Sequence, residues 1–466
     1  MIGATRRLAW AAGLLGLVSL TAAAPLTLSG QDTVRQVEQG VRIGITYTPG
    51  LRPGMLVLGS ERTPFLDSLR TIIQRDLDYS DRFEMITLPG QESLMVALAP
   101  PAPAPRDPPA GVSGGAASFV NYGLYEALGA DYAVSVRAAP DTPAVITVFD
   151  VRGRVDRRTL VLWANDFRHP ETRLTIHRVS DEVVRATAGT PGIAATRLLL
   201  IQGKRVYRVD TDGADAVAVS PATDTALSPA WSLDGRRAVY MQFVGGNGRL
   251  YLHDIASGRR DLVGPTASGL YYTPAFSPDG RSLAFSFANE EGSHLYTYNI
   301  VERCCLQRLT AGRFSDNLSP TFSPDGRRVA FTSTRAGAPQ IYVMSADGTG
   351  QELFAPFDYG VTGSSYAPEW SPDGLNLAFH RDVAGTPQVF VMDVSSRRVR
   401  QLTSAGRNED PTWAPDGRHL AFVSTRTGSR QAWIIDLDTG RVRQLTRLGE
   451  ARLPAWSPRI TEGSNP

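Results

Sequence analysis

A short phrase recurs through the second half of this 466-residue chain and constrains its fold more than any other feature. The phrase joins a Pro and an aromatic residue to an Asp-Gly turn, and its complete copies occupy residues 228–235, 273–280, 319–326, 367–374 and 410–417. A shortened copy follows at 453–458, and the aromatic residue returns after 45, 46, 48, 43 and 43 residues. A period in the forties with strand-like content is typical of a β-propeller.

The stretch from one phrase toward the next predicts four strands. In residues 319–353, the segment 320–323 is a first strand, and Pro324-Asp325-Gly326 is a turn in which Pro presets φ and Gly supplies a positive φ. Residues 328–332 and 340–344 are the second and third strands, and a fourth ends near Leu353. Four strands per repeat correspond to one propeller blade.

The two ends of the repeat region complement each other. Residues 196–202, 205–210 and 215–220 match a second, third and fourth strand without an opening strand, whereas the shortened copy at 453–458 is an opening strand alone. Pairing these ends completes a sixth blade and removes the free sheet edges that invite aggregation. We therefore expect a six-bladed β-propeller over residues 193–466.

The preceding region, residues 31–192, predicts a small N-terminal α/β domain. Helices are expected from Pro64, with Thr63 as a capping residue, at 121–128 and at 173–188. Strands are expected at 54–59, 82–88, 131–137, 144–151 and 159–165. The Pro/Ala-rich segment 98–118 is interpreted as a flexible surface insertion because it cannot build a core.

The first 30 residues resemble a secretion signal. Arg6 and Arg7 precede an apolar run at 8–20, and three alanines at 22–24 suit cleavage. The alternative, a membrane anchor, is disfavoured because a spanning helix needs about 20 apolar residues. We expect a soluble exported protein, and the net charge of +2 gives no indication of nucleic-acid binding.

Motifs for catalysis or metal binding lack their structural context. Gly111-Val-Ser-Gly-Gly115 fits the serine-hydrolase pattern, but no strand precedes it, and only residues 459–466 follow the last blade, too few for the hydrolase domain of propeller peptidases. Asp210-Thr-Asp-Gly213 with Asp215 predicts a turn rather than a calcium loop. The five repeated aspartates are also interpreted as turn formers; they are Asp234, Asp279, Asp325, Asp373 and Asp416.

The two cysteines, Cys304 and Cys305, are adjacent. Neighbours on a strand point to opposite faces, which disfavours a disulfide between them. The six scattered histidines offer no cluster to complete a metal site. We expect two ordinary strand residues, with no catalytic residues, no cofactor and no metal.

The order of the parts resembles the TolB family, the periplasmic component of the Tol–Pal envelope system. Ser180-Asp-Glu-Val-Val184 and Gly192-Ile-Ala-Ala-Thr-Arg197 are similar to the family's junction before the propeller. The resemblance implies a periplasmic protein-binding adaptor and not an enzyme. It would link the inner-membrane Tol complex to the peptidoglycan-associated lipoprotein, for envelope integrity, outer-membrane constriction at division and transport of proteins and bacteriocins.

The resemblance also implies two partner-binding regions. The lipoprotein would bind propeller loops that lead into each phrase, on the face opposite the Pro-Asp-Gly turns; the corresponding residues are Leu270, Tyr271, Tyr272, Asp316, Asn317, Leu318, Tyr366 and Asp410. Tyr271 and Tyr272 suit an interface, although packing between blades is the alternative for both. TolA would bind an N-terminal segment comprising Val41, Arg42, Ile43, Gly44 and Ile45, where Gly44 and Thr46 depart from the family's pattern.

Two other functions compete with the adaptor. An exported propeller can bind a small molecule or glycan in its central channel, or act there as an enzyme, and a convergent cluster of carboxylates, His and Arg in the channel would favour this. A secreted scaffold without a Tol partner is the third possibility. We expect a monomer that binds no nucleic acid and does not span a membrane.

Overall fold

The computed structural model describes residues 35–36, 52–59, 63–88, 120–139, 142–163, 171–223, 225–264, 267–312, 315–357, 362–447 and 449–460. Residues 31–466 form one compact unit. The expected signal peptide 1–30, the segment 41–45, the insertion 98–118 and the motif 111–115 lie outside the described residues. Among the described helices, none is long and apolar enough to cross a membrane.

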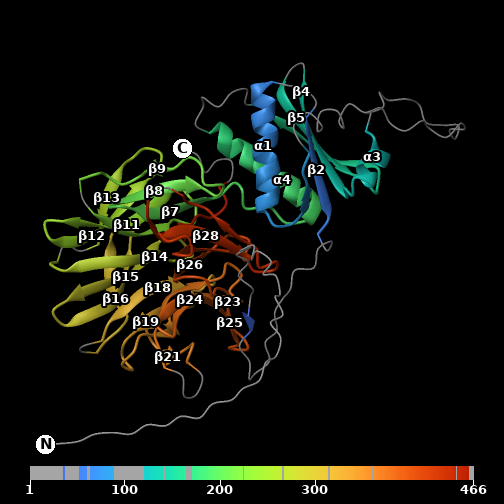
Figure 1. The fold of residues 1–466 in the computed structure, drawn as a ribbon. Coiled ribbons are helices and arrows are strands. Elements are labelled where there is room, and N and C mark those ends of the chain that lie inside the picture. The colour runs from blue at the N-terminus through green and yellow to red at the C-terminus, as the bar shows by residue number, and fades with distance from the viewer. Residues whose placement is uncertain are drawn as a thin grey trace, which may run out of the picture. The chain divides into compact units, whose positions relative to one another are not determined.

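The repeat region is all β, and its sheets follow the repeats (Figure 1). The first sheet has the order β30-β7-β8-β9, formed by Ala451–Trp456, Arg197–Gln202, Arg205–Asp210 and Val217–Ala218. Two further units, β10 to β13 and β14 to β17, are joined into one sheet by a single bridge between Gly248 and Leu270. Their strands are Ala226–Trp231, Arg237–Val244, Asn247–Asp254, Arg260–Val263, Leu270–Phe276, Ser282–Asn289, Gly292–Asn299 and Cys304–Arg308.

Three more sheets complete this region. Strands β18 to β21 are Asn317–Phe322, Arg328–Ser333, Gln340–Ser345 and Glu352–Leu353. Strands β22 to β25 are Ser365–Trp370, Asn376–Val383, Thr386–Asp393 and Val399–Gln401, with the two-residue β1, Arg35–Gln36, added beside β25. Strands β26 to β29 are Asn408–Trp413, His419–Ser424, Gln431–Asp436 and Val442–Gln444.

The phrase sets the backbone within the first strand of each unit and in the turn that follows it. Its first residue has a positive φ, between 46° and 53°, at Ser228, Thr273, Ser319, Ala367, Asp410 and Leu453, and a register shift follows there. At the other end, the Ser277 hydroxyl donates to Asp279, which accepts the Arg281 backbone N–H. The turn-forming role predicted for the repeated aspartates is therefore confirmed, as is the turn at 210–213, where the Gly213 N–H donates to the Asp210 carbonyl.

The expected pairing of the two ends is confirmed. Strand β30 runs antiparallel to β7, with Trp456 opposite Leu198. The Trp456 indole N–H donates to the Thr196 hydroxyl at 2.8 Å, and both groups are buried. The last phrase thus supplies the first strand in the order of this sheet, whose next strand, β7, begins about 260 residues earlier in the chain.

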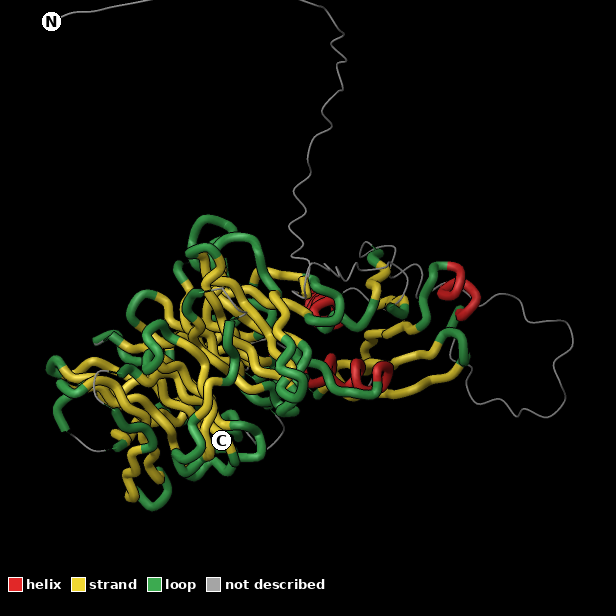
Figure 2. The backbone as a smooth tube through the Cα atoms, turned by 90° about the horizontal axis from the view of Figure 1, so that it is seen from below, coloured by secondary structure: helices red, strands yellow, loops and turns green. Residues whose placement is uncertain are grey.

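Residues 52–188 form a mixed sheet with the order β3-β2-β4-β5-β6. Its strands are Glu84–Ile86, Gly54–Gly59, Tyr132–Ala139, Thr142–Asp150 and Val155–Leu162, and its helices are α1, Pro64–Tyr79, α3, Tyr122–Ala127, and α4, Thr172–Ala188. Figure 2 shows that the described helices belong to this region and that the rest of the described chain is strand and loop.

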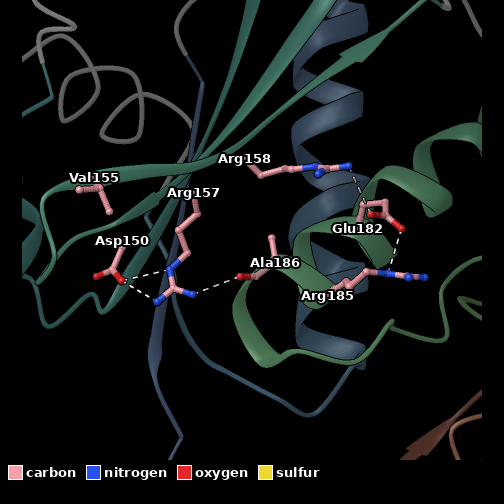
Figure 3. Close-up of a pocket in the computed structure, with 7 residues that line it drawn as sticks. All are labelled: Asp150, Val155, Arg157, Arg158, Glu182, Arg185 and Ala186. Atoms are coloured by element: carbon pink, nitrogen blue, oxygen red, sulfur yellow. Dashed lines mark hydrogen bonds and ion pairs between the residues drawn. The ribbon is translucent and has the colours of Figure 1, made fainter.

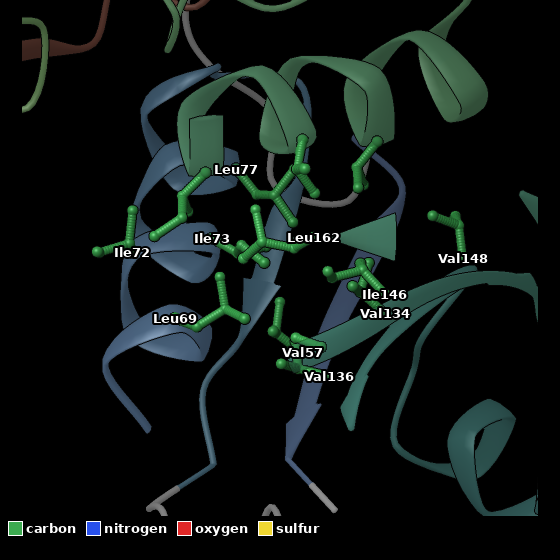
Figure 4. Packing of buried hydrophobic residues seen from close by; sticks show 14 of the residues in the cluster. Val57, Leu69, Ile72, Ile73, Leu77, Val134, Val136, Ile146, Val148 and Leu162 are labelled. Atoms are coloured by element: carbon green, nitrogen blue, oxygen red, sulfur yellow. The ribbon is translucent and has the colours of Figure 1, made fainter. Parts of the chain in front are cut away.

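The helices α1 and α4 pack on one face of this sheet (Figure 4). Leu69, Ile73 and Leu77 of α1 meet Val57, Val134 and Ile146 of the strands in a buried cluster. The sequence signals act as predicted: the Thr63 hydroxyl accepts the Leu66 N–H, and Gly189 ends α4 with a φ of 79°. This packing holds the C-terminal end of α1, which carries Asp76, Asp78 and Asp81 at or near it, in a fixed place.

The expectation for the two cysteines is wrong. Cys304 and Cys305 form a disulfide with each other at the start of β17. The prediction assumed an extended strand with alternating side chains, but Cys305 has a φ of 65° and Arg303 a φ of 54°. The left-handed backbone removes the strand alternation on which the argument against pairing depended.

Candidate partner-binding surface

The residues predicted to lie in loops are, except for Asp316, among the first residues of β14, β18, β22 and β26, so the prediction of loops was wrong for them. They lie at the ends of these strands away from the Pro-Asp-Gly turns. Leu270 is the most exposed of the first group, with 37% of its surface accessible. Tyr272 is half-buried, and its hydroxyl shares a 2.6 Å hydrogen bond with Ser293. Both residues therefore combine an accessible surface with a fixed backbone.

Tyr271 differs from its neighbours because it belongs to the core. It is 3% exposed, and its ring lies 4.4 Å from that of Phe287 and 5.7 Å from that of Phe285, between centroids. The Arg249 guanidinium lies 5.7 Å from the Tyr271 ring centroid. The packing alternative thus describes Tyr271.

The next group is joined to the first through Ser293. The Ser293 hydroxyl donates to the Asn317 carbonyl at 3.3 Å, while the Asn317 amide donates to the Ser293 carbonyl at 3.0 Å. Asp316 is exposed and Leu318 half-buried. The structure therefore brings Tyr272, Asp316 and Leu318, from two successive repeats, to one area of the surface.

Asn317 is fully buried and has a structural role. Its side-chain oxygen accepts hydrogen bonds from the Ser333 hydroxyl and the Arg335 guanidinium. Asn408, at the same place in a later repeat, accepts a hydrogen bond from the Arg426 guanidinium in the same way. The repetition of the arrangement indicates that this position ties the first strand of a unit to the loop after the second.

A separate cluster contains Tyr366 and Asp410. The His380 ring stacks on that of Tyr366 at 5.4 Å between centroids, and its Nδ1 accepts the Asp410 backbone N–H at 3.2 Å. Burial lowers the pKa of His380 to about 4, so this ring is neutral at pH 7. Sequence reasoning missed His380. Aligning the first two strands of this repeat with those of the others would have placed His380 opposite Tyr366 in the hairpin of β22 and β23.

The phrases also line a central cavity of about 340 Å³. Each copy contributes the residues around its Pro, and the described lining contains Ser, Thr, Pro, Ala, Leu, Phe and Trp with two acids, Glu369 and Asp410. The Glu369 carboxyl accepts hydrogen bonds from the Trp413 backbone N–H and the Thr412 hydroxyl, and burial raises its pKa to about 7. Burial and nearby Glu409 raise the pKa of Asp410 to about 7 as well. No His, Arg or Lys belongs to the described lining, so the convergent cluster that would favour a channel enzyme is missing there.

Two buried histidines form charged networks that sequence analysis did not anticipate. Nδ1 of His419 lies 2.7 Å from an Asp416 carboxylate oxygen, and its Nε2 lies 3.3 Å from Asp81. Burial alone would lower the pKa of His419, but attraction and hydrogen bonds from Asp416 and Asp81 raise it to about 9. His177 on α4 contacts Asp76 in the same manner, at 2.7 Å.

Arginines complete these networks. Arg441 binds both Asp78 and Asp81, while Arg75 and Arg173 bind Asp212. Two of the three-residue groups with metal-ligand geometry lie here: Asp76, His177 and Asp212 in one, and Asp81, His419 and Asp436 in the other. Arginines contact Asp212, Asp81 and Asp436 of these groups, which are therefore ion-pair networks that fasten residues 52–188 to β7, β8 and β27 to β29.

A shallow groove beside β5, β6 and α4 is lined mainly by charged side chains (Figure 3). Arg157 donates to Asp150 and to the Ala186 carbonyl, and Glu182 pairs with Arg185 at 3.1 Å and with Arg158 at 3.9 Å. All five charged side chains that line it pair with one another. The groove is therefore a surface ion-pair network rather than a site prepared for a ligand.

Comparisons with known proteins agree with this architecture. The model of the TolB beta propeller domain matches residues 186–356 and 359–462, more than half of the chain. The Tol-Pal system protein TolB of Methylococcus capsulatus is 33% identical over 236 residues, which are 49% of this chain and 50% of that protein. The chain thus spans about half the length of this curated relative.

Among solved structures, TolB from Acinetobacter baumannii aligns with a TM-score of 0.70 at 24% identity, over 88% of this chain and 98% of that one. A putative TolB from Agrobacterium tumefaciens aligns with a TM-score of 0.46 at 22% identity, over 55% and 90%. The first likeness shows the β-propeller fold. With the match to the propeller model, it follows that this chain belongs to the TolB beta propeller family.

Proposed function

We propose that this protein is a periplasmic adaptor of the TolB type that works in a Tol–Pal system and has no enzymatic activity. Family membership and the name of the Methylococcus relative support this proposal. The observation that carries it furthest is the surface at the start of β14 and β18. There, side chains from two repeats lie on a rigid framework joined by Ser293.

The proposed partner on this surface is the peptidoglycan-associated lipoprotein. Leu270, Tyr272, Asp316 and Leu318 would contact it directly, and Tyr366 and Asp410 would extend the contact area. Tyr271 and Asn317 would act indirectly because they are buried beneath it. An apolar centre with an aromatic side chain and a carboxylate at its rim is the composition expected of a protein-binding surface.

Four finer parts of the proposal have support of different kinds. A closed ring of six blades is supported by five propeller sheets, one of which contains two repeat units, and by the pairing of β30 with β7. A division between an α/β domain at 31–192 and a propeller at 193–466 is supported by the change from mixed to all-β sheets. A TolA-binding segment at 41–45 and export by a signal at 1–30 have only the sequence in their favour.

Calorimetric titration of the mature protein with the cognate peptidoglycan-associated lipoprotein tests the proposal. Leu270→Asp and Leu318→Asp place a charge in the proposed contact, and we expect each to weaken binding at least about tenfold. Leu375→Asp is the matched control, because Leu375 is 63% exposed in a Pro-Asp-Gly turn at the other end of its unit. Absence of binding by the wild type, or equal weakening by the control, would contradict the proposal.

A ligand-binding role for the central channel is the second candidate. Its support is the cavity of about 340 Å³ with the two raised-pKa carboxyls, Glu369 and Asp410. The lack of basic groups in the described lining makes it the weaker one. Chemical-shift changes confined to channel residues on addition of a glycan mixture, with no response to the lipoprotein, would favour it over the adaptor.

A further inference from the structure

A second cleft lies away from the proposed lipoprotein surface, at the outer side of two adjacent repeat units. Strands β8 and β9 form one wall, and β12 with the start of β13 forms the other. Its volume is about 360 Å³, within the range of small-molecule sites. Nothing in the adaptor function makes use of this cleft.

The inner end of the cleft is closed by the core between the two units. Ile201 and Val206 of the first unit pack there with Tyr240 of the second, and Val219 and Ile255 border the same cluster. Toward solvent the walls separate, and exposed Val217 stands at the opening. The cleft therefore has an apolar floor.

Three arginines surround the opening. Arg205 and Arg208 come from β8, and Arg260 comes from β13 on the opposite wall. Arg208 pairs with Asp215 at 2.9 Å. Among the described residues, Asp215 is the single carboxylate partner that these three guanidinium groups have, and no acid belongs to the lining.

Each arginine is also held in position by its neighbours. Arg205 donates from Nε and from a terminal nitrogen to the Ser220 carbonyl, at 2.9 and 2.6 Å. Arg260 donates to Gln242 at 3.1 Å and lies 5.5 Å from the Tyr251 ring centroid. These contacts use only part of the five N–H donors on each guanidinium, and fixed guanidinium forks match the oxygens of phosphate.

His253 adds a polar group to the β12 wall without adding charge. It is buried, and its Nδ1 lies 3.2 Å from the Tyr240 hydroxyl. Burial and the neighbouring Arg260 lower the pKa of His253, so the imidazole is neutral at pH 7. The positive charge of the cleft therefore comes from the arginines and does not change over the neutral range.

We propose that this cleft binds a phosphomonoester, with the phosphate held between Arg205, Arg208 and Arg260 and the attached carbon skeleton against Val217, Val219 and Ile255. Opposed guanidinium groups on two rigid walls account for the dianionic group, and the apolar floor accounts for an organic substituent. The site is independent of the adaptor function, because its residues come from β8, β9, β12 and β13 rather than from the loops before the phrases.

Calorimetric titration of the full mature protein with glucose 1-phosphate and with inorganic phosphate tests this site at constant ionic strength. Charge-assisted contacts to two or three arginines predict a dissociation constant on the order of 1 mM or lower for the ester. Binding of both compounds supports the site, and tighter binding of the ester supports the role of the apolar wall. Absence of any binding at about ten times that concentration overturns the proposal.

The variant Arg205→Gln/Arg260→Gln removes one cation from each wall, and we expect it to weaken binding of the ester at least about tenfold. Arg327→Gln is the control, since Arg327 is exposed in a Pro-Asp-Gly turn of another unit. If the double variant melts earlier without ligand, the single variant Arg260→Gln replaces it, because this residue is exposed. Equal affinity of wild type and the arginine variants would refute the site.

Discussion

Replacing His419 by Gln should remove a large part of the pH dependence of stability between pH 6 and 10. His419 lies fully buried on β27 between the carboxylates of Asp416 and Asp81, with Asp436 3.8 Å away. Burial opposes its charge, but these acids raise the pKa of His419 to about 9. Arg418 and Arg441 face the same carboxylates and keep their charge throughout this range.

The magnitude follows from the two pKa values. The usual histidine pKa of 6.5 stands for the unfolded chain, and a pKa of about 9 for the folded one. At about 1.4 kcal/mol per pKa unit, protonation of His419 contributes about 3 kcal/mol to the free energy of unfolding. Because the folded pKa is the higher one, the contribution is complete below pH 6.5 and is lost as pH rises through about 9.

Urea unfolding followed by far-ultraviolet circular dichroism, at half-unit steps of pH, measures this contribution. Asp181, Glu369 and Asp410 have pKa values raised to about 7, and their effect is nearly complete by pH 8. The difference between wild type and His419→Gln cancels them. We expect this difference to shrink by about 3 kcal/mol from pH 6 to pH 10, with about 1 kcal/mol of the loss above pH 8.

His177 provides the comparison, because its pKa is also raised by nearby carboxylates, chiefly that of Asp76, against the effect of burial. His177→Gln should flatten the profile in the same direction. A variant of His253, whose pKa is lowered by burial, should not. If wild type and His419→Gln differ by a constant amount at every pH, the ring is not charged in the folded protein, and the reasoning fails.

Three further outcomes follow from single contacts. Tyr271→Ala should lower the free energy of unfolding by about 3 kcal/mol in chemical denaturation because it opens a cavity beside Phe285 and Phe287, whereas Tyr272→Phe should change it by about 1 kcal/mol or less. Gly348→Ala should destabilise more than Gly337→Ala in a thermal melt. Both glycines have a positive φ, but only at Gly348 would a Cβ lie 2.7 Å from the Leu309 carbonyl oxygen, and equal melting temperatures would contradict this. Glu369→Gln should have a higher free energy of unfolding than wild type at pH 8, and the two should be equal at pH 4. The wild type loses stability when the Glu369 carboxyl ionises as pH rises through about 7, whereas Gln does not ionise.

The repeat made most of the propeller predictable. Pro, Asp and Gly specify the turn by local backbone chemistry, and the aromatic residue marks the first strand, so strand order and the pairing of 453–458 with 196–202 followed from spacing alone. In the same way, Thr63 predicted the start of α1 and Gly189 predicted the end of α4. Such features depend on neighbours within about five residues, which the sequence displays directly.

The features that could not be predicted depend on residues distant in the chain or on backbone angles. Tyr271 and Tyr272 look alike in sequence, yet strand alternation turns one toward Phe287 and the other toward Ser293. Asp416 shares its phrase with four other aspartates, but only the fifth copy has a His three residues later and Asp81 opposite it. The disulfide at Cys304 and Cys305 required the positive φ of Cys305, which no residue type in that turn signals.

The fifth copy of the phrase shows how a repeat acquires a new role without losing its original one. In the other four complete copies a Ser hydroxyl donates to the turn Asp, but position 414 is Ala. Asp416 still accepts the Arg418 and His419 backbone N–H groups, so the turn survives, and its second carboxylate oxygen is left to bind the His419 ring. That ring reaches Asp81 at the end of α1. The histidine at position 419 thus adds to the local turn an attachment between the repeat region and residues 52–188.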